Sequence, residues 1–178
     1  MPTQVRARCQ SCQTATRRPA PLAAAAALGS ELDGRPLAAT AAVTASWRWT
    51  CGGCGLVTPS LEAARIAVES GSPATGLRLA LQAAWIADDH DPEAAPPCRE
   101  AAAWLARRAG GQDALLADLH RRNGELDAAL AAAHRVLDAW PDPRLAALAR
   151  HQLELVAAGD TGRHSMVDLF ARTAGEAI

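Results

Sequence analysis

The pattern of hydrophobic and polar positions changes once along the 178 residues, near residue 58. Before that point, residues 5–9 and 43–51 alternate apolar and polar side chains with a period of two. Such alternation is typical of a strand with one buried face. We therefore expect two short strands, with Trp47 and Trp49 of the second one covering the turn that follows it.

After residue 58, apolar residues recur at the spacing of an amphipathic helix, as Leu77, Leu81 and Trp85 do. Thr58-Pro59 is typical of an N-cap followed by a first helical residue. The pattern predicts helices over about 59–70, 74–88, 97–109, 112–122, 125–140 and 143–158. The expected fold is mainly α with a small β ribbon, divided into a ribbon domain at 1–58 and a helical domain at 59–178.

Two C-x-x-C pairs, Cys9/Cys12 and Cys51/Cys54, lie at the ends of the predicted strands. A two-residue spacer lets one tight turn aim both sulfurs at a single ion, so two pairs predict a four-thiolate metal site. The second turn, CGGCG, has the glycines that a sharp bend favours, whereas the first, CQSCQT, has none. We expect a structural Zn²⁺ on these four cysteines, which stabilises the fold and does not catalyse, because no position is left for water.

Alternatives to zinc stay open from the sequence. Four thiolates also hold iron, the pairs can form disulfides in an oxidising compartment, and one C-x-x-C can be a redox motif. The spacer of 38 residues, 13–50, exceeds the usual length of roughly 15–20. Its alanine stretch and the turn-like GSELDGRP, 29–36, suggest a small inserted helix and loop.

The charge changes where the hydrophobic pattern does. Residues 1–58 carry six arginines against two acids, a net charge of +4, while residues 59–178 carry twelve against seventeen, a net charge of −5. Every basic residue other than histidine is arginine, which excludes P-loop, Schiff-base and kinase lysines. No run of 18 strongly apolar residues occurs, so we expect no membrane span and a cytoplasmic protein.

One helical hairpin, LLADLHRRNGELDAALAAAHRVLDAWPDP at 115–143, resembles the tetratricopeptide repeat. Gly124 lies between the helices, Ala129 at their crossing and Pro141 after the second, although Asp113 and His120 occupy positions where aromatic residues are usual. With Cys9, Cys12, Cys51 and Cys54 ahead of it, the chain resembles uncharacterised bacterial proteins that join a thiolate zinc ribbon to a tetratricopeptide-like region. The resemblance implies a binding or scaffolding role and no known reaction.

Other candidate residues show no catalytic spacing. His90-Asp91 is the kind of dipeptide found in metal-dependent phosphohydrolases, but we interpret it as a solvated loop after a helix. Cys98 follows two prolines at a predicted helix start, where its pKa can fall, yet no base partner is recognisable. The remaining histidines lack ligand spacing and are interpreted as surface or packing residues; they are His120, His134, His151 and His164.

The sequence favours a non-enzymatic zinc-binding adaptor that presents a helical-repeat surface to a protein partner or to a second copy of itself. The alternative is a nucleic-acid-associated factor that uses the arginines of the ribbon. An enzyme or redox protein based on Cys98 or on an iron site is the weaker third interpretation. The arginines behind the alternative are Arg6, Arg8, Arg17, Arg18 and Arg48.

Overall fold

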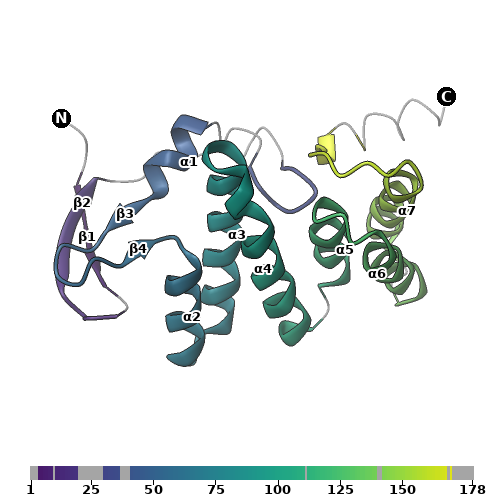
Figure 1. Cartoon of the computed structure of the whole chain (residues 1–178). Helices are drawn as coiled ribbons and strands as arrows, with labels where there is room; N and C mark the ends of the chain where they lie inside the picture. Colours follow the sequence, from purple (N-terminus) through teal and green to yellow (C-terminus); the bar gives the residue numbers. More distant parts are fainter. Residues whose placement is uncertain are drawn as a thin grey trace. The chain divides into compact units, whose positions relative to one another are not determined.

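The computed structural model describes residues 4–9, 11–19, 30–36, 41–110, 112–139, 142–167 and 169. In these residues the chain forms seven α-helices and two antiparallel sheets of two strands each (Figure 1). The expected fold class, mainly α with a small β ribbon beside the cysteines, is confirmed. The alanine stretch at 21–28, where an inserted helix is expected, lies outside the described residues.

Both sheets of the ribbon are short hairpins around a cysteine turn. Strands β1 (Gln4–Arg8) and β2 (Ala15–Pro19) pair in the register that sets Arg6 opposite Arg17. Strands β3 (Trp49–Thr50) and β4 (Val57–Thr58) pair on either side of the second cysteine turn. The strand predicted at 5–9 is confirmed, and its partner β2 shows no comparable alternation of apolar residues.

The strand predicted at 43–51 is largely wrong. Residues Ala41–Trp47 form helix α1, and only Trp49–Thr50 is strand. The alanines of this segment favour a helix, and a helix of only seven residues is too short for its apolar spacing to be distinguished from the alternation of a strand. Trp47 packs edge-on against Trp85 of another helix, with 6.2 Å between the ring centroids.

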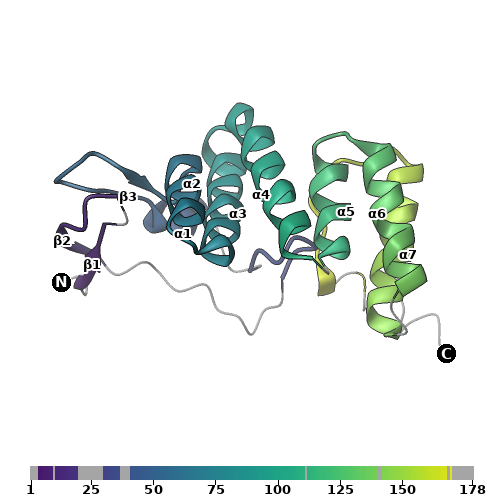
Figure 2. The ribbon, with the colours of Figure 1, turned by 90° about the horizontal axis from the view of Figure 1, so that it is seen from below.

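Helices α2 (Leu61–Glu69), α3 (Pro73–His90) and α4 (Ala95–Ala109) follow the ribbon and lie side by side (Figures 1 and 2). The first begins two residues later than predicted, because Ser60 is the N-cap and accepts a hydrogen bond from the Ala63 amide at 3.1 Å. Small residues let α2 and α3 approach closely. A Cβ on Gly76 would lie 2.6 Å from Val68 Cγ2, so only glycine fits this crossing.

Helices α5 (Asp113–Arg122), α6 (Leu126–Ala139) and α7 (Pro143–Ala157) are successive neighbours (Figure 2). Gly124 adopts a left-handed conformation, with φ of 77°, in the tight turn between α5 and α6. Ala129 and Ala133 are fully buried on α6, as their predicted place at a helix crossing requires. The predicted helices of this region are confirmed within two residues.

The turn at residues 30–36 belongs with the C-terminal helices and not with the ribbon. Glu31 forms an isolated bridge with Ser165, and the Leu32 side chain joins an apolar cluster with Leu148 and Leu155. Asp33 pairs with Arg122 of α5 at 2.7 Å, and both side chains are buried. The spacer between the two cysteine pairs therefore supplies part of the core on which α5 and α7 pack.

Contacts between residues divide the chain into two compact units. One contains Met1–Ala24 and Ala39–Leu105, and the other contains Ala25–Ala38 and Ala106–Ile178. The domain boundary predicted at residue 58 is based on a change in composition and charge, whereas these two units are defined by contacts. The predicted boundary therefore stays a prediction.

Candidate metal centre

The two cysteine turns have the same backbone geometry although their sequences differ. In the first, the Cys9 amide donates to Thr14 O at 3.1 Å and the Gln13 amide donates to Cys9 O at 3.0 Å. In the second, the Cys51 amide donates to Leu56 O and the Gly55 amide to Cys51 O, both at 2.8 Å. The donors and acceptors are separated by the same number of residues in each turn, so both are zinc-knuckle-like turns built around a C-x-x-C pair.

This geometry requires a left-handed residue directly after the second cysteine of each pair. Gly55 fills it in the second turn with φ of 77°, at no steric cost. Gln13 fills the same position in the first turn with φ of 58°, and it is the one non-glycine residue with positive φ in the described chain. The missing glycine of CQSCQT is therefore replaced by a strained glutamine and not by another turn type.

The two turns bring all four sulfur atoms together, within 4.8 Å of one another. Cys9 Sγ lies 3.6 Å from Cys54 Sγ, and Cys12 Sγ lies 3.7 Å from Cys51 Sγ. Four sulfurs bound tetrahedrally at about 2.3 Å from one zinc ion would be about 3.8 Å apart, close to these distances. The donor set and its spacing therefore fit a tetrahedral metal ion, and all four cysteines are free thiols.

Close contacts between the turns hold the sulfurs in place. The Gly53 amide donates to Cys51 Sγ at 3.4 Å. A Cβ on Gly53 would lie 2.9 Å from Thr14 Oγ1 and 3.5 Å from Cys12 Sγ, so this glycine lets the second turn pack on the first. Sequence reasoning assigned Gly53 to the bend alone and did not single out Thr14. The sequence signal for Thr14 was weak, since any residue with a hydroxyl group beside a C-x-x-C pair can make the same contact with the second turn.

The cluster has an inner and an outer half. Cys9 and Cys51 are 1% exposed, whereas Cys12 and Cys54 are open to solvent. Side-chain and backbone hydrogen bonds from Thr14 lower the pKa of Cys12 to about 6. Cys12 is therefore the first of the outer thiols to become a thiolate, the form that binds a metal. An ion held by four protein sulfurs has no open coordination position, so its chemistry is structural.

The other candidate residues do not join this cluster. Within the described residues, the four cysteines form the one group of three or more potential ligands close enough to share an ion. His90 ends α3 and Asp91 is its C-cap, both exposed, as expected of a solvated helix end. Cys98 is buried, and burial raises its pKa, so the expectation that a helix start can lower it is wrong.

His120 is buried and not a surface residue. It lies between Arg107, 3.1 Å from Nε2, and the carboxylate of Glu125 at Nδ1. Because a guanidinium only donates hydrogen bonds, Nε2 accepts, and Nδ1 carries the proton that it donates to Glu125. His120 therefore links α4, α5 and the turn before α6, a packing role.

No helix in the described part of the chain has both the length and the apolar character needed to cross a membrane. Comparisons of the sequence and structure with protein-family models, with curated proteins and with solved structures find no match.

Proposed function

We propose that this protein is a non-enzymatic adaptor, in which a structural zinc ion orders the N-terminal ribbon and the helices present a docking surface to a protein partner. The four-sulfur cluster supports the zinc, since its geometry suits a tetrahedral ion and thiolate is the ligand that zinc favours over harder cations. The proposal implies a reducing compartment such as the cytoplasm, where thiols stay free.

The observation that carries the adaptor role is an apolar groove between α2 and α4. Its volume is about 500 Å³, and its walls are almost entirely apolar. Trp104 is 46% exposed there and Leu61 is 36% exposed, although large apolar residues are usually covered. The groove is lined by six apolar residues and, on the α2 side, by the ion-paired Arg65 and Glu69; the apolar ones are Leu61, Ala64, Val68, Ala101, Trp104 and Leu105.

The occupant that fits this groove best is an amphipathic helix of a partner protein with basic residues beside its apolar face. A groove between two helices accepts a third helix through anchors spaced by one turn, and exposed tryptophans dominate such interfaces. The rim on α2 is acidic overall, because the single charge of Arg65 is shared between Glu62 and Glu69. A basic flank on the partner would complement this rim.

The C-terminal helices extend the proposal. The hairpin of α5 and α6, with its left-handed Gly124 and buried Ala129, supports a tetratricopeptide-like arrangement. Arrays of this kind bind other proteins and carry no reaction of their own. On this proposal the chain functions as a ribbon at 1–58 followed by a helical binding region at 59–178.

The test is affinity capture from the native cell, followed by reconstitution with each purified partner. Trp104→Glu should abolish binding of the partner, because a charge would be buried in the apolar groove. Leu130→Glu is the matched control, since Leu130 is 39% exposed on α6 and lies outside the groove. Equal binding by wild type and the Trp104 variant would contradict the proposal. A dimer that Trp104→Glu disrupts would identify a second copy as the occupant.

One face of the β1–β2 hairpin favours the alternative of nucleic-acid binding. Arg6 and Arg17 are cross-strand partners, and Arg8 lies two residues along on the same face. All three are exposed, and none of their side chains forms an ion pair or hydrogen bond within the described residues. Like charges placed opposite each other destabilise a hairpin, which favours an external anion such as a phosphate backbone as their partner.

The salt dependence of binding to labelled single-stranded RNA tests this alternative. Three phosphate contacts predict a slope of about −2 for log affinity against log salt concentration. Replacing Arg6, Arg8 and Arg17 by alanine together should remove that slope. The same change at three exposed arginines of the helices should not alter it; these are Arg78, Arg144 and Arg150. Absence of binding at low salt would reject the alternative.

A further inference from the structure

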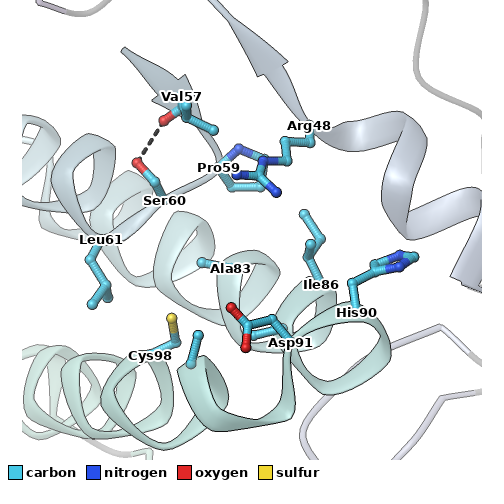
Figure 3. Close-up of a pocket in the computed structure, with 12 residues that line it drawn as sticks. Arg48, Val57, Pro59, Ser60, Leu61, Ala83, Ile86, His90, Asp91 and Cys98 are labelled. Carbon is cyan, nitrogen blue, oxygen red and sulfur yellow. Dashed lines mark hydrogen bonds between the residues drawn. The ribbon is translucent and has the colours of Figure 1, made fainter. Parts of the chain in front are cut away.

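A second cavity lies in the same unit as the ribbon, between the turn after β4 and the helices α3 and α4 (Figure 3). Its volume is about 230 Å³. That is room for about eight water molecules at roughly 30 Å³ each, and it is below the range of about 300–1,000 Å³ for drug-sized ligands. A small metabolite fits this cavity, whereas a nucleotide does not.

Two opposite charges face the cavity, and neither has a side-chain partner in the described part of the chain. The Arg48 guanidinium enters from the side of β3, and the Asp91 carboxylate enters from the end of α3 (Figure 3). Within the described residues, neither side chain forms an ion pair or a hydrogen bond, with the other or with a third group. The Ser60 hydroxyl, in contrast, is engaged by the fold, since it donates to Val57 O at 2.6 Å and accepts from the Ala63 amide.

The floor of the cavity is apolar and close to α3. Ala83 and Ile86 contribute aliphatic surface, and the Cys98 thiol points up from α4 between them and Leu61 (Figure 3). Cys98 is 7% exposed, and its thiol has no hydrogen bond within the described residues. Burial raises its pKa, so it remains a neutral thiol at physiological pH and adds soft apolar surface.

We propose that this cavity binds a free α-amino acid with an aliphatic side chain. The carboxylate of the ligand would pair with Arg48, its ammonium group with Asp91, and its side chain would lie on Ala83, Ile86 and Cys98. A zwitterion with an apolar side chain can pair with both Arg48 and Asp91 and can also pack against the apolar floor of the cavity. A simple carboxylate would leave Asp91 facing a second anion, and a simple amine would leave Arg48 facing a second cation.

This inference is independent of the adaptor role, because the cavity shares only Leu61 with the apolar groove. It is also independent of a metal, since Cys98, His90 and Asp91 do not converge closely enough to share an ion.

The test is calorimetric titration of the full-length, zinc-loaded protein with L-leucine. The matched probes are 4-methylpentanoate, which lacks the ammonium group, and 3-methylbutylamine, which lacks the carboxylate. L-Leucine should bind at least about tenfold more tightly than either probe, because each probe loses one of the two charge-assisted hydrogen bonds. Absence of heat with L-leucine up to about 10 mM, or equal binding of a probe, would overturn the proposal.

Two variants assign the binding to this cavity. Arg48→Gln and Asp91→Asn should each weaken L-leucine binding at least about tenfold. Both residues are exposed and make no side-chain bonds within the described residues, so folding should be unaffected. Arg150→Gln and Asp138→Asn change exposed charges elsewhere and should bind like wild type. Unchanged binding in both cavity variants would overturn the assignment.

Alkylation of Cys98 by iodoacetamide, followed by peptide mass spectrometry, gives a second readout. Bound L-leucine should slow the modification of Cys98 several-fold in the wild type, because the ligand covers the thiol. It should not slow modification in the Asp91→Asn variant. Equal protection of Cys98 in the two proteins would contradict the proposed orientation of the ligand.

Discussion

At the scale of single residues, the cysteine turns depend on a left-handed backbone conformation that their sequences provide unequally. Gly55 adopts it freely, whereas Gln13 adopts it against the steric repulsion between its Cβ and the backbone. This left-handed conformation costs about 1 kcal/mol, and the cost arises only in the folded ribbon, because the unfolded chain does not hold Gln13 in it. The first turn is therefore the weaker half of the metal centre.

Gln13→Gly should accordingly raise the affinity for zinc about fivefold, since zinc binding and ribbon folding are coupled. Gly55→Gln should lower it by about the same factor. Competition with a chromophoric chelator measures both. Gly52→Ala is the control, because Gly52 has no positive φ and its added Cβ would meet no atom within 4 Å. A weaker affinity for zinc in Gln13→Gly would show that contacts of the Gln13 side chain stabilise the metal-bound ribbon by more than its backbone conformation destabilises it.

Asp33 is a second residue whose surroundings set its behaviour. Burial away from water, with the negative charge of Asp118 nearby, raises the pKa of Asp33 to about 6, against the opposing effect of Arg122. The unfolded chain loses this proton near pH 3.8. Between these values the folded state binds the proton and the unfolded state does not, so the contribution of Asp33 to stability is present at low pH and lost as pH rises towards 6.

Asp33→Asn removes this titration. The unfolding free energy of the variant minus that of the wild type should therefore increase by up to about 3 kcal/mol as the pH rises from 4 to 7. Urea unfolding of both proteins at several pH values measures the difference and cancels the titration of other groups. A difference that moves in favour of wild type as pH rises would show that pairing with Arg122 outweighs burial.

At the scale of elements, α5 depends on a buried charge that several segments satisfy together. The Arg121 guanidinium is fully buried, 2.7 Å from Asp118 on the same helix and 2.9 Å from the Gln152 side chain on α7. It also donates to the backbone oxygen of Asp160 at 2.6 Å. Gln152 in turn donates to Asp118 at 3.0 Å, so the network closes on itself. This network fixes α5 against α7 with defined partners.

Asp118→Ala should therefore destabilise the protein by about 3–5 kcal/mol, because it leaves the charge of Arg121 buried with one anion fewer. Arg135→Ala is the control, since it breaks an ion pair with Asp113 that is largely open to solvent. The control should change stability by less than about 1 kcal/mol. Thermal and urea unfolding measure both. Similar losses of stability in the two variants would mean that the buried network around Arg121 does not stabilise the packing of α5 against α7.

At the scale of the whole molecule, the chain leaves the ribbon between the two cysteine pairs and returns to it. Residues 30–36 of this spacer pack with α5 and α7, while the cysteines on either side of it meet in the other unit. A metal on the four cysteines would close the loop from Cys12 to Cys51, and the packing of Leu32 and Asp33 anchors residues in its middle.

Removal of the metal should unfold the ribbon and leave the helices formed, because none of the contacts described for α5, α6 and α7 involves the cysteine cluster. We expect about one zinc per chain by elemental analysis, and chelation should make four thiols reactive with little change in helical circular dichroism. Cys9→Ser should lose the zinc, whereas Cys98→Ser should retain it. Loss of the helical signal together with the metal would show that the spacer transmits unfolding.

Prediction from the sequence succeeded where the signal is local. The C-x-x-C spacing indicated the four cysteines that meet, because two residues between ligands already define the turn. The apolar stripes indicated α2 to α7, because a helix repeats within a few residues along the chain. It failed for residues 43–47, because the seven residues of α1 are too few to separate a strand from a helix and the packing of Trp47 on Trp85 stabilises the helix.

The sequence by itself determined the cysteine cluster, the helical class and the absence of lysine chemistry, since each depends on residue type and short spacing. Only the tertiary structure decided that residues 30–36 join the C-terminal helices, that Asp33 meets Arg122, and that Arg48 and Asp91 face one cavity. These contacts join positions as distant in the sequence as Glu31 and Arg163, which are 132 residues apart. Their formation depends on packing and burial between distant segments, for which no local pattern of side chains carries a signal.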